Sequence, residues 1–252
     1  MHSKNRLAAG AALVAAACAT AYAHHHHVTV RTATGTPGEQ LTIVVGYYAE
    51  EADLTIDPKT LQILDGGKPF VVALPTLATK GPLAGTYTGD GLSLTSDFFS
   101  ADGVLDGAEI EYELVAVTPV EGPACDGVWC TTDPETGVVS IEAMSGGATR
   151  ADRSLHVGFD GHPHGQLLGV TQEGEYDLTL VAWDANGVFL DSDPVIVRVH
   201  AHVPTPDFNG DGMVDGADLG FLLGSWGTHE ADLDGDGMTD GADLGILLGA
   251  WG

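Results

Sequence analysis

The sequence DFNGDGMVDGADLGFLLGSWG at residues 207–227 is closely repeated as DLDGDGMTDGADLGILLGAWG at residues 232–252. The second copy begins twenty-five residues after the first, so an internal duplication is visible without an alignment. In both copies, oxygen-bearing side chains occupy positions 1, 3, 5, 9 and 12, and position 6 is glycine. These side chains are Asp207, Asn209, Asp211, Asp215 and Asp218, and then Asp232, Asp234, Asp236, Asp240 and Asp243.

This spacing is typical of a calcium-binding loop. Calcium is a hard cation that takes six to eight oxygen ligands, and a twelve-residue loop that turns sharply at its sixth residue wraps them around one point. Gly212 and Gly237 stand at the turn, and Met213 and Met238 at position 7 would each donate a backbone carbonyl. The sequence therefore predicts two Ca²⁺ ions, one in each loop. An acidic turn that binds nothing does not explain why the spacing occurs twice.

A short helix is predicted after each loop. Leucine and tryptophan recur with a helical period in both copies, at Leu219, Leu222, Leu223 and Trp226, and at Leu244, Leu247, Leu248 and Trp251. This period predicts one apolar stripe on each helix. Gly227 and Gly252 are expected to end the helices.

No entering helix is predicted before either loop. Pro204 and Pro206 precede the first loop, and the linker Gly-Thr-His-Glu-Ala at 227–231 precedes the second. An ordinary EF-hand has an entering helix and usually glutamate at position 12, and this chain has neither. A loop with an exiting helix, repeated and carrying Asp at position 12, resembles the type I dockerin over residues 205–252.

The resemblance implies antiparallel helices, calcium-dependent folding and docking onto a cohesin-like protein. Many dockerins contact the cohesin through hydroxyl side chains at loop positions 10 and 11. This chain has Gly216 and Ala217 there, and Gly241 and Ala242 in the second loop. The partner therefore stays open between a cohesin and another surface-anchoring or matrix protein.

The amino terminus predicts export. Lys4 and Arg6 lead into an apolar run at 7–19, and residues 21–23 read Ala-Tyr-Ala, which is typical of a signal peptide over residues 1–23. Because no apolar run is long enough to span a membrane, we expect a secreted or cell-surface protein. A lipid anchor on Cys18 is an alternative, although the preceding alanines lack the usual leucine.

The charge of the chain excludes several partners. All 36 acidic residues lie beyond residue 23, and the formal net charge of the whole chain is −27. Such a chain repels nucleic acid and anionic membranes. We therefore expect no nucleic-acid partner and no membrane span.

Residues 24–203 predict an all-β region. Short runs rich in β-branched and aromatic residues alternate with turn residues, at 27–34, 41–48, 61–64, 69–74, 110–117, 137–141, 155–159, 176–183 and 195–203. This rhythm favours one β-sandwich, or two small ones, with the run at 195–203 closing the last sheet. Residues 204–206 are the linker. The predicted fold class is mainly β, with a β-sandwich payload followed by a small α-helical calcium-binding domain at 207–252.

The two cysteines of the mature chain lie close together, in Cys125-Asp-Gly-Val-Trp-Cys130. An exported protein meets oxidising conditions, so the sequence favours a Cys125–Cys130 disulfide in a surface turn over free thiols or a metal site.

Histidine is unusually frequent, with 11 residues against 9 lysines and arginines. His162 with His164 and His200 with His202 are spaced by two, which puts both imidazoles of each pair on one face of an extended segment. Together with the run at 24–27, they predict a Zn²⁺ or Cu²⁺ site drawn from His24, His26, His156, His162, His164, His200 and His202. Ordinary surface or core histidines are the alternative. Residues 156–200, through the strings HPH, EYDLTL and LDSDP, resemble histidine-rich, surface-anchored bacterial proteins linked to zinc.

The predicted function is that of a non-catalytic, exported protein attached through its tail. A carbohydrate-active or carbohydrate-binding payload for polysaccharide is the alternative. A glycoside hydrolase needs two opposed carboxylates, and Glu109, Glu111 and Glu113 supply acids without a pairing signature. A copper-dependent oxidative enzyme would instead use His24 as the new amino terminus.

Overall fold

A computed structural model describes residues 26–46, 53–96, 105–133, 136, 138–158, 166–228, 230–234 and 238–252. The predicted signal peptide, Cys18, His24, His162, His164 and Asp236 lie outside these residues. Within them the chain is mainly β, as the sequence predicts, and carries two α-helices near its carboxyl end.

The described residues form sixteen strands and two α-helices. The strands are β1 (His26–Arg31), β2 (Thr42–Val44), β3 (Leu54–Ile56), β4 (Ile63–Asp65), β5 (Lys68–Pro69), β6 (Val71–Leu74), β7 (Thr76–Leu77), β8 (Tyr87–Gly89), β9 (Leu92–Ser96), β10 (Ile110–Glu121), β11 (Gly127–Thr132), β12 (Val139–Met144), β13 (Ser154–His156), β14 (Gln166–Val170), β15 (Gly174–Asp184) and β16 (Val195–Ala201). The helices are α1 (Gly216–Gly224) and α2 (Gly241–Gly249), and short 3-10 turns lie at Gly81–Leu83 and Ala151–Arg153.

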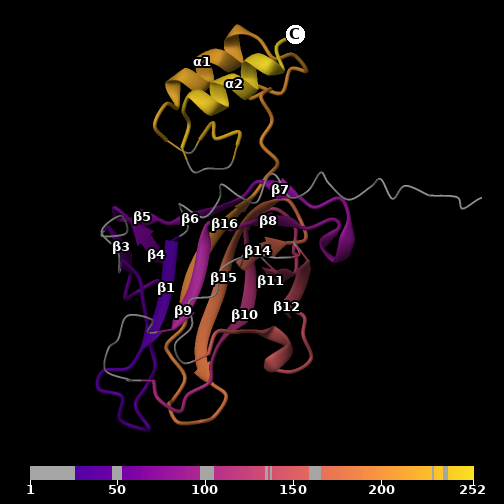
Figure 1. The fold of residues 1–252 in the computed structure, drawn as a ribbon. Coiled ribbons are helices and arrows are strands. Elements are labelled where there is room, and N and C mark those ends of the chain that lie inside the picture. Colours follow the sequence, from indigo (N-terminus) through magenta and orange to yellow (C-terminus); the bar gives the residue numbers. More distant parts are fainter. Residues whose placement is uncertain are drawn as a thin grey trace, which may run out of the picture.

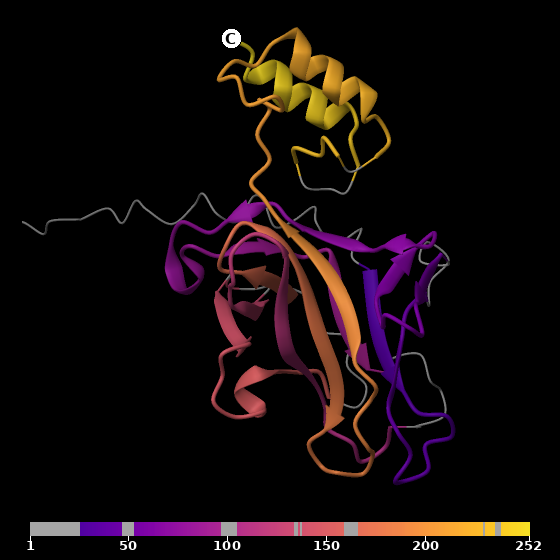
Figure 2. The same ribbon diagram turned by 180° about the vertical axis from the view of Figure 1, so that it is seen from behind.

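The longest strands build one layer of the β region. Its sheet has the order β13-β10-β15-β16-β6, and Figures 1 and 2 show β10, β15 and β16 side by side. The predicted alternation in 176–183 is confirmed, because Tyr176, Leu178, Leu180 and Ala182 are buried while the residues between them are partly exposed. β16 does not close the sheet as predicted, since β6 pairs with its other edge in parallel.

Two sheets of shorter strands make the facing layer, one of three strands in the order β2-β1-β9 and one of five in the order β12-β11-β14-β8-β7. The side-chain amide of Gln166 in β14 joins them, accepting from Leu94 N at 2.8 Å and donating to Leu94 O at 2.8 Å in β9. The buried Tyr112 hydroxyl donates to Thr95 O at 2.8 Å and so links the layers. A fourth sheet, with the order β3-β4-β5, consists of three short strands. One buried apolar cluster includes side chains of all four sheets, so the layers share a single core.

Each of the nine predicted runs overlaps a strand, but several strands were missed. The largest of these are β9, β11 and β14. β9 reads Leu-Ser-Leu-Thr-Ser and is buried at every position, its serines and threonine included. The run alternates between apolar and polar residues, but it holds one β-branched residue and no aromatic one, so a search for runs rich in these residues missed it.

The predicted disulfide is wrong in this structure, where Cys125 and Cys130 are both free. Their segment is not a surface turn, because β11 begins at Gly127 and its Trp129 is fully buried. The extended chain of β11, which rises about 3.3 Å per residue from Gly127, carries Cys130 away from Cys125, whereas a disulfide needs the two Cα atoms within roughly 7 Å. Burial raises the pKa of the Cys130 thiol to about 11, which also disfavours its reactive thiolate.

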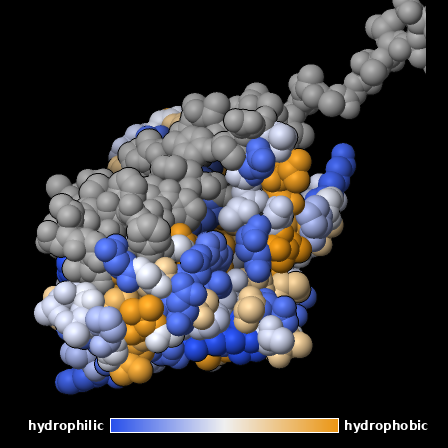
Figure 3. Space-filling model, turned by 60° about the horizontal axis from the view of Figure 1, so that its bottom comes forward, coloured by the Kyte–Doolittle hydropathy of each residue, from blue (hydrophilic) through white to orange (hydrophobic). Residues whose placement is uncertain are grey.

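The chain leaves β16 through residues 202–206 and enters the two-helix tail. Figures 1 and 2 show α1 and α2 lying side by side, beyond the end of the sheet at which β16 finishes. Neither helix, and no other helix among the described residues, is long and apolar enough to cross a membrane. On the face shown in Figure 3, hydrophobic residues of the described chain form separate patches between hydrophilic ones, as is usual for a solvated surface.

Candidate calcium-binding tail

The helices begin where the loops end, and the same residues serve both. Asp215 is the N-cap of α1, and its Oδ1 accepts from Ala217 N at 2.8 Å. Asp240 caps α2 in the same way, accepting from Ala242 N at 2.7 Å. Each cap satisfies an amide that the helix cannot pair internally, and each carboxylate favours the positive end of the helix dipole. Position 9 of each loop is therefore a helix cap.

Position 12 closes each loop onto its own beginning. The Asp218 carboxylate accepts from Asp215 N at 2.9 Å and from Phe208 N at 2.8 Å, and it is fully buried. These backbone donors, that of Asp215 first, hold the pKa of the Asp218 carboxyl below its usual range. In the second copy Asp243 is equally buried and accepts from Asp240 N and Leu233 N, both at 2.6 Å. One carboxylate thus fixes the start of the loop and the start of the helix.

The first loop wraps around Asp207. Its Oδ1 accepts from Gly210 N at 2.8 Å, and its Oδ2 accepts from Gly212 N at 2.9 Å. Gly210 and Gly212 have φ values of +70° and +89°, a conformation that side chains other than glycine rarely adopt. Glycine at position 6 therefore allows the sharp turn that the sequence predicts.

The second loop gathers carboxylates most tightly. One oxygen each from Asp232, Asp234 and Asp243 lies within 4.8 Å of the others. Oxygens that share one calcium ion at about 2.3–2.6 Å are at most about 5 Å apart, so the three fit that ion. Among the residues that the structure describes, this is the one group of three acidic, histidine or cysteine donors so close together. The first loop has Asn209 in place of Asp234, and its amide oxygen is also a suitable ligand.

The two copies complete each other. Gly227 N at the end of the first copy donates to Thr239 O of the second at 3.0 Å, and Gly252 N of the second donates to Val214 O of the first at 3.2 Å. These bonds are equivalent under the twenty-five-residue repeat. Leu222 and Leu247 are fully buried between the helices, in a small cluster with Val214 and Ala231. Each copy therefore depends on the other for its packing and its terminal hydrogen bond.

The predicted apolar stripes are only partly buried. In α1 Leu222 is 0% exposed, whereas Leu223 is 52% exposed and Trp226, after the helix, is 48% exposed. The second copy repeats this, with exposed Leu248 and Trp251. Two nine-residue helices bury only the row at their contact, and the rest of each apolar surface stays outside. Phe221 and Ile246 enlarge the exposed set.

The described histidines of the predicted transition-metal site lie in different places. His26 in β1 packs its ring edge-on against Phe70 at 4.7 Å. His156 is bracketed by carboxylates, with Nε2 3.0 Å from Glu109 and Nδ1 3.5 Å from Glu111. β1 pairs with β2 and β9, not with β16, so the first and last strands are not the paired neighbours that the prediction assumed. His200 and His202 do lie together, with parallel rings 5.9 Å apart.

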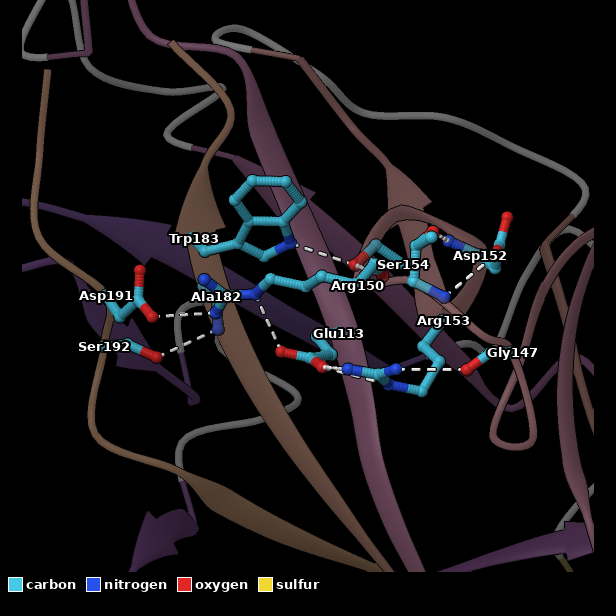
Figure 4. Close-up of polar contacts among 11 residues, drawn as sticks. Glu113, Gly147, Arg150, Asp152, Arg153, Ser154, Ala182, Trp183, Asp191 and Ser192 are labelled. Atoms are coloured by element: carbon cyan, nitrogen blue, oxygen red, sulfur yellow. Dashed lines mark hydrogen bonds and ion pairs between the residues drawn. The ribbon is translucent and has the colours of Figure 1, made fainter. Parts of the chain in front are cut away.

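The glutamates considered for catalysis are engaged in ion pairs. Glu113 receives Arg150 Nε at 2.8 Å and an Arg153 nitrogen at 2.6 Å (Figure 4). Arg150 also lies 4.4 Å from the centre of the Trp183 ring in β15, which is a cation–π contact. Arg150 and Arg153 thus hold the Glu113 carboxylate between them, and we call this group the arginine clamp. Glu109 and Glu111 both face His156, and burial raises the pKa of Glu111. The sequence did not predict this clamp, whose only signal is two arginines three residues apart in a chain poor in basic residues.

Comparisons of the chain with protein-family models, with curated proteins and with solved structures give no match. The residues and contacts described above are therefore the basis for a function.

Proposed function

We propose that this is an exported protein in which a β-sandwich payload is attached to a partner by a calcium-dependent, dockerin-like tail. The observation that carries the proposal is the close group of carboxylate oxygens from Asp232, Asp234 and Asp243. Carboxylates this close repel one another, and a divalent cation removes that repulsion. The ion would be held by the side chains at positions 1, 3, 5, 9 and 12 of each loop and by the carbonyl of Met213 or Met238.

Calcium would also supply the stability that the tail lacks by itself. Isolated helices shorter than about twelve residues are marginal in water, and α1 and α2 have nine residues each. Their buried cluster has four fully or nearly fully buried side chains. Because ion binding to a site absent from the unfolded chain stabilises the fold, the tail is expected to fold when calcium binds.

The exposed apolar side chains of the tail support attachment as its task. They come in equivalent pairs from the two copies: Phe221 and Ile246, Leu223 and Leu248, and Trp226 and Trp251. Large contiguous apolar patches on a protein surface often mark protein-binding sites, and these six side chains would supply such a patch. The proposed partner is a cohesin-like protein or another surface or matrix anchor, outside the cell.

Calcium titration of the mature full-length chain tests the proposal. We expect the helical circular-dichroism signal to rise from chelator to millimolar calcium, with a stoichiometry of two ions per chain. The fluorescence of Trp226 and Trp251 should change in parallel, because both lie in the tail. A double variant with Trp129→Phe and Trp183→Phe restricts the tryptophan fluorescence to the tail, because the chain has four tryptophans and the other two are Trp226 and Trp251.

A chain ending at residue 206 is the matched control, and it should show no calcium response. Magnesium at the same concentration should be far less effective, because it demands an octahedral site and gives up water reluctantly. If the full-length chain binds no calcium, or binds it without any change in the tail, the proposed tether is wrong. If the chain does bind calcium, its calcium-dependent retention on immobilised cohesin modules would indicate a cohesin partner, and a lack of retention would indicate another anchor.

A further inference from the structure

His200 and His202 lie together on the outer face of the large sheet. In β16 the buried side chains are Val195, Val197, Val199 and Ala201, so His200 points outward. His202 directly follows the strand and is also exposed. The two imidazole rings lie 5.9 Å apart between centroids, with their planes 9° from parallel. Two imidazoles bound to one ion at about 2.0–2.1 Å have ring centroids about 5–6 Å apart, so the separation of these rings is close to that of a shared ion. Because an imidazole binds a metal in the plane of its ring, the stacked His200 ring would turn about its side-chain bonds as the ion binds.

Glu173 prepares one of these rings for a metal. Glu173 lies directly before β15, and its Oε1 is 2.6 Å from His202 Nδ1. A carboxylate accepts but does not donate, so this bond places the imidazole proton on Nδ1 and leaves the lone pair of Nε2 available. A histidine held by a carboxylate through its other nitrogen is the usual arrangement of a metal ligand. His156 differs, because carboxylates lie against both of its nitrogens.

The surrounding charge favours a cation. Glu175 lies opposite His200 in the β15–β16 ladder. In the part of this face that the structure describes, Arg198 is the one neighbouring cation. It is paired with Glu175 at 3.1 Å and with Asp177 at 2.8 Å. Glu173, Glu175 and Asp177 together exceed the charge of Arg198, so the local field attracts positive ions.

We propose that His200 and His202 bind one divalent transition-metal ion, Cu²⁺ or Zn²⁺, with Glu173 as the residue that positions His202. Imidazole is a ligand for both ions, and Cu²⁺ binds more tightly than Zn²⁺ to a given nitrogen site. Two protein ligands leave coordination positions for water or for a further ligand. The site is separate from the calcium loops, so it does not depend on the proposed tether.

Calorimetric titration of Zn²⁺ into the mature full-length chain tests the site. Saturating calcium keeps zinc out of the carboxylate loops. We expect one zinc ion per chain, and loss of that binding in His200→Ala and in His202→Ala. His156→Ala is the matched control and should bind zinc as the natural chain does. With Cu²⁺, the electron paramagnetic resonance spectrum should show two coupled nitrogens, and one or none in the two variants.

Glu173→Gln separates positioning from coordination. An outer-shell partner of a metal-bound histidine typically contributes 10–100-fold to affinity, so we expect a weakening of this size with both copper nitrogens retained. Full zinc affinity in His202→Ala would overturn the proposal. So would loss of zinc binding on replacing the histidines at 24–27 by alanine, because the run would then be the site. The calcium affinity of the same variants should equal that of the natural chain. A failure of the histidine site therefore would not contradict the calcium-dependent tether, and a failure of the tether would not contradict the histidine site.

Discussion

The two copies of the tail share a fold but differ in charge and in several side chains, among them the buried residue at position 8. Positions 9 and 12 are aspartate in both, and their backbone hydrogen bonds match one for one. Position 3 is Asn209 in the first loop and Asp234 in the second, and position 8 is Val214 in the first and Thr239 in the second. The positions that start the helices are thus the same in both copies. The positions that differ are position 3, which changes the charge of the loop, and position 8, which changes a buried contact.

The largest expected effect comes from position 12. Asp218→Ala and Asp243→Ala each remove a carboxylate that holds both ends of its loop and, in the proposed function, a calcium ligand. Because the copies complete each other, we expect either change to unfold the whole tail at 25 °C in millimolar calcium. The measurement is the helical circular-dichroism signal of the full-length chain.

Asp106→Ala, an exposed aspartate of the β region, is the matched control and should leave the helical signal unchanged. If only the copy that carries the substitution lost its structure, the two copies would be independent. The hydrogen bonds from Gly227 to Thr239 and from Gly252 to Val214 would then not couple them.

The next largest effect concerns the helix contact. Leu222 and Leu247 are equally buried, so Leu222→Ala and Leu247→Ala should each destabilise the tail by about 2–5 kcal/mol, as for other core leucines. Denaturant unfolding followed by tail fluorescence measures this. Leu223→Ala and Leu248→Ala change exposed leucines and should cost much less. A large cost at Leu223 would mean that this side chain is buried in solution.

The differences between the two copies also indicate which features the sequence could predict. Each loop and the helix after it depend on residues within about twenty positions, so spacing alone predicted a loop followed by a helix in each copy. The spacing marked Asp215 and Asp240 only as calcium ligands, and their role as helix caps required the structure. The burial of Leu222 and the exposure of Leu223 depend on which helix face meets the partner copy, and periodicity does not choose between adjacent leucines. The pairing of β1 with β9, and the strand that replaced the Cys125–Cys130 turn, depend on contacts between distant segments. For the histidines, spacing predicted the His200–His202 pair, but the carboxylate of Glu173 required the structure.

A smaller effect is expected at position 8. Thr239 Oγ1 accepts from Ala231 N at 3.1 Å, and both residues are buried. The equivalents in the first copy are Val214 and Pro206, and proline has no N–H to satisfy. Thr239→Val would therefore leave a buried donor unpaired and should cost about 1–3 kcal/mol.

Val214→Thr is the reciprocal change, and it should not improve stability because no amide awaits the hydroxyl. Thermal unfolding of both variants in saturating calcium measures the difference. Equal stability losses would indicate that shape, rather than the hydrogen bond to Ala231, selects the side chain at position 8.

The smallest expected effect separates charge from fold at position 3. If the second loop binds calcium more tightly because Asp234 adds a carboxylate to its group, then Asn209→Asp should tighten the first loop and Asp234→Asn should loosen the second. Each change should alter the calcium dissociation constant by about fivefold, or about 1 kcal/mol. Two-site calorimetric titration measures both constants. The double variant exchanges the side chains between the loops and should exchange the constants, while the helical content at saturating calcium stays the same. If the constants instead stay with their original loops, then loop geometry, rather than the number of carboxylates, sets the affinity of each copy.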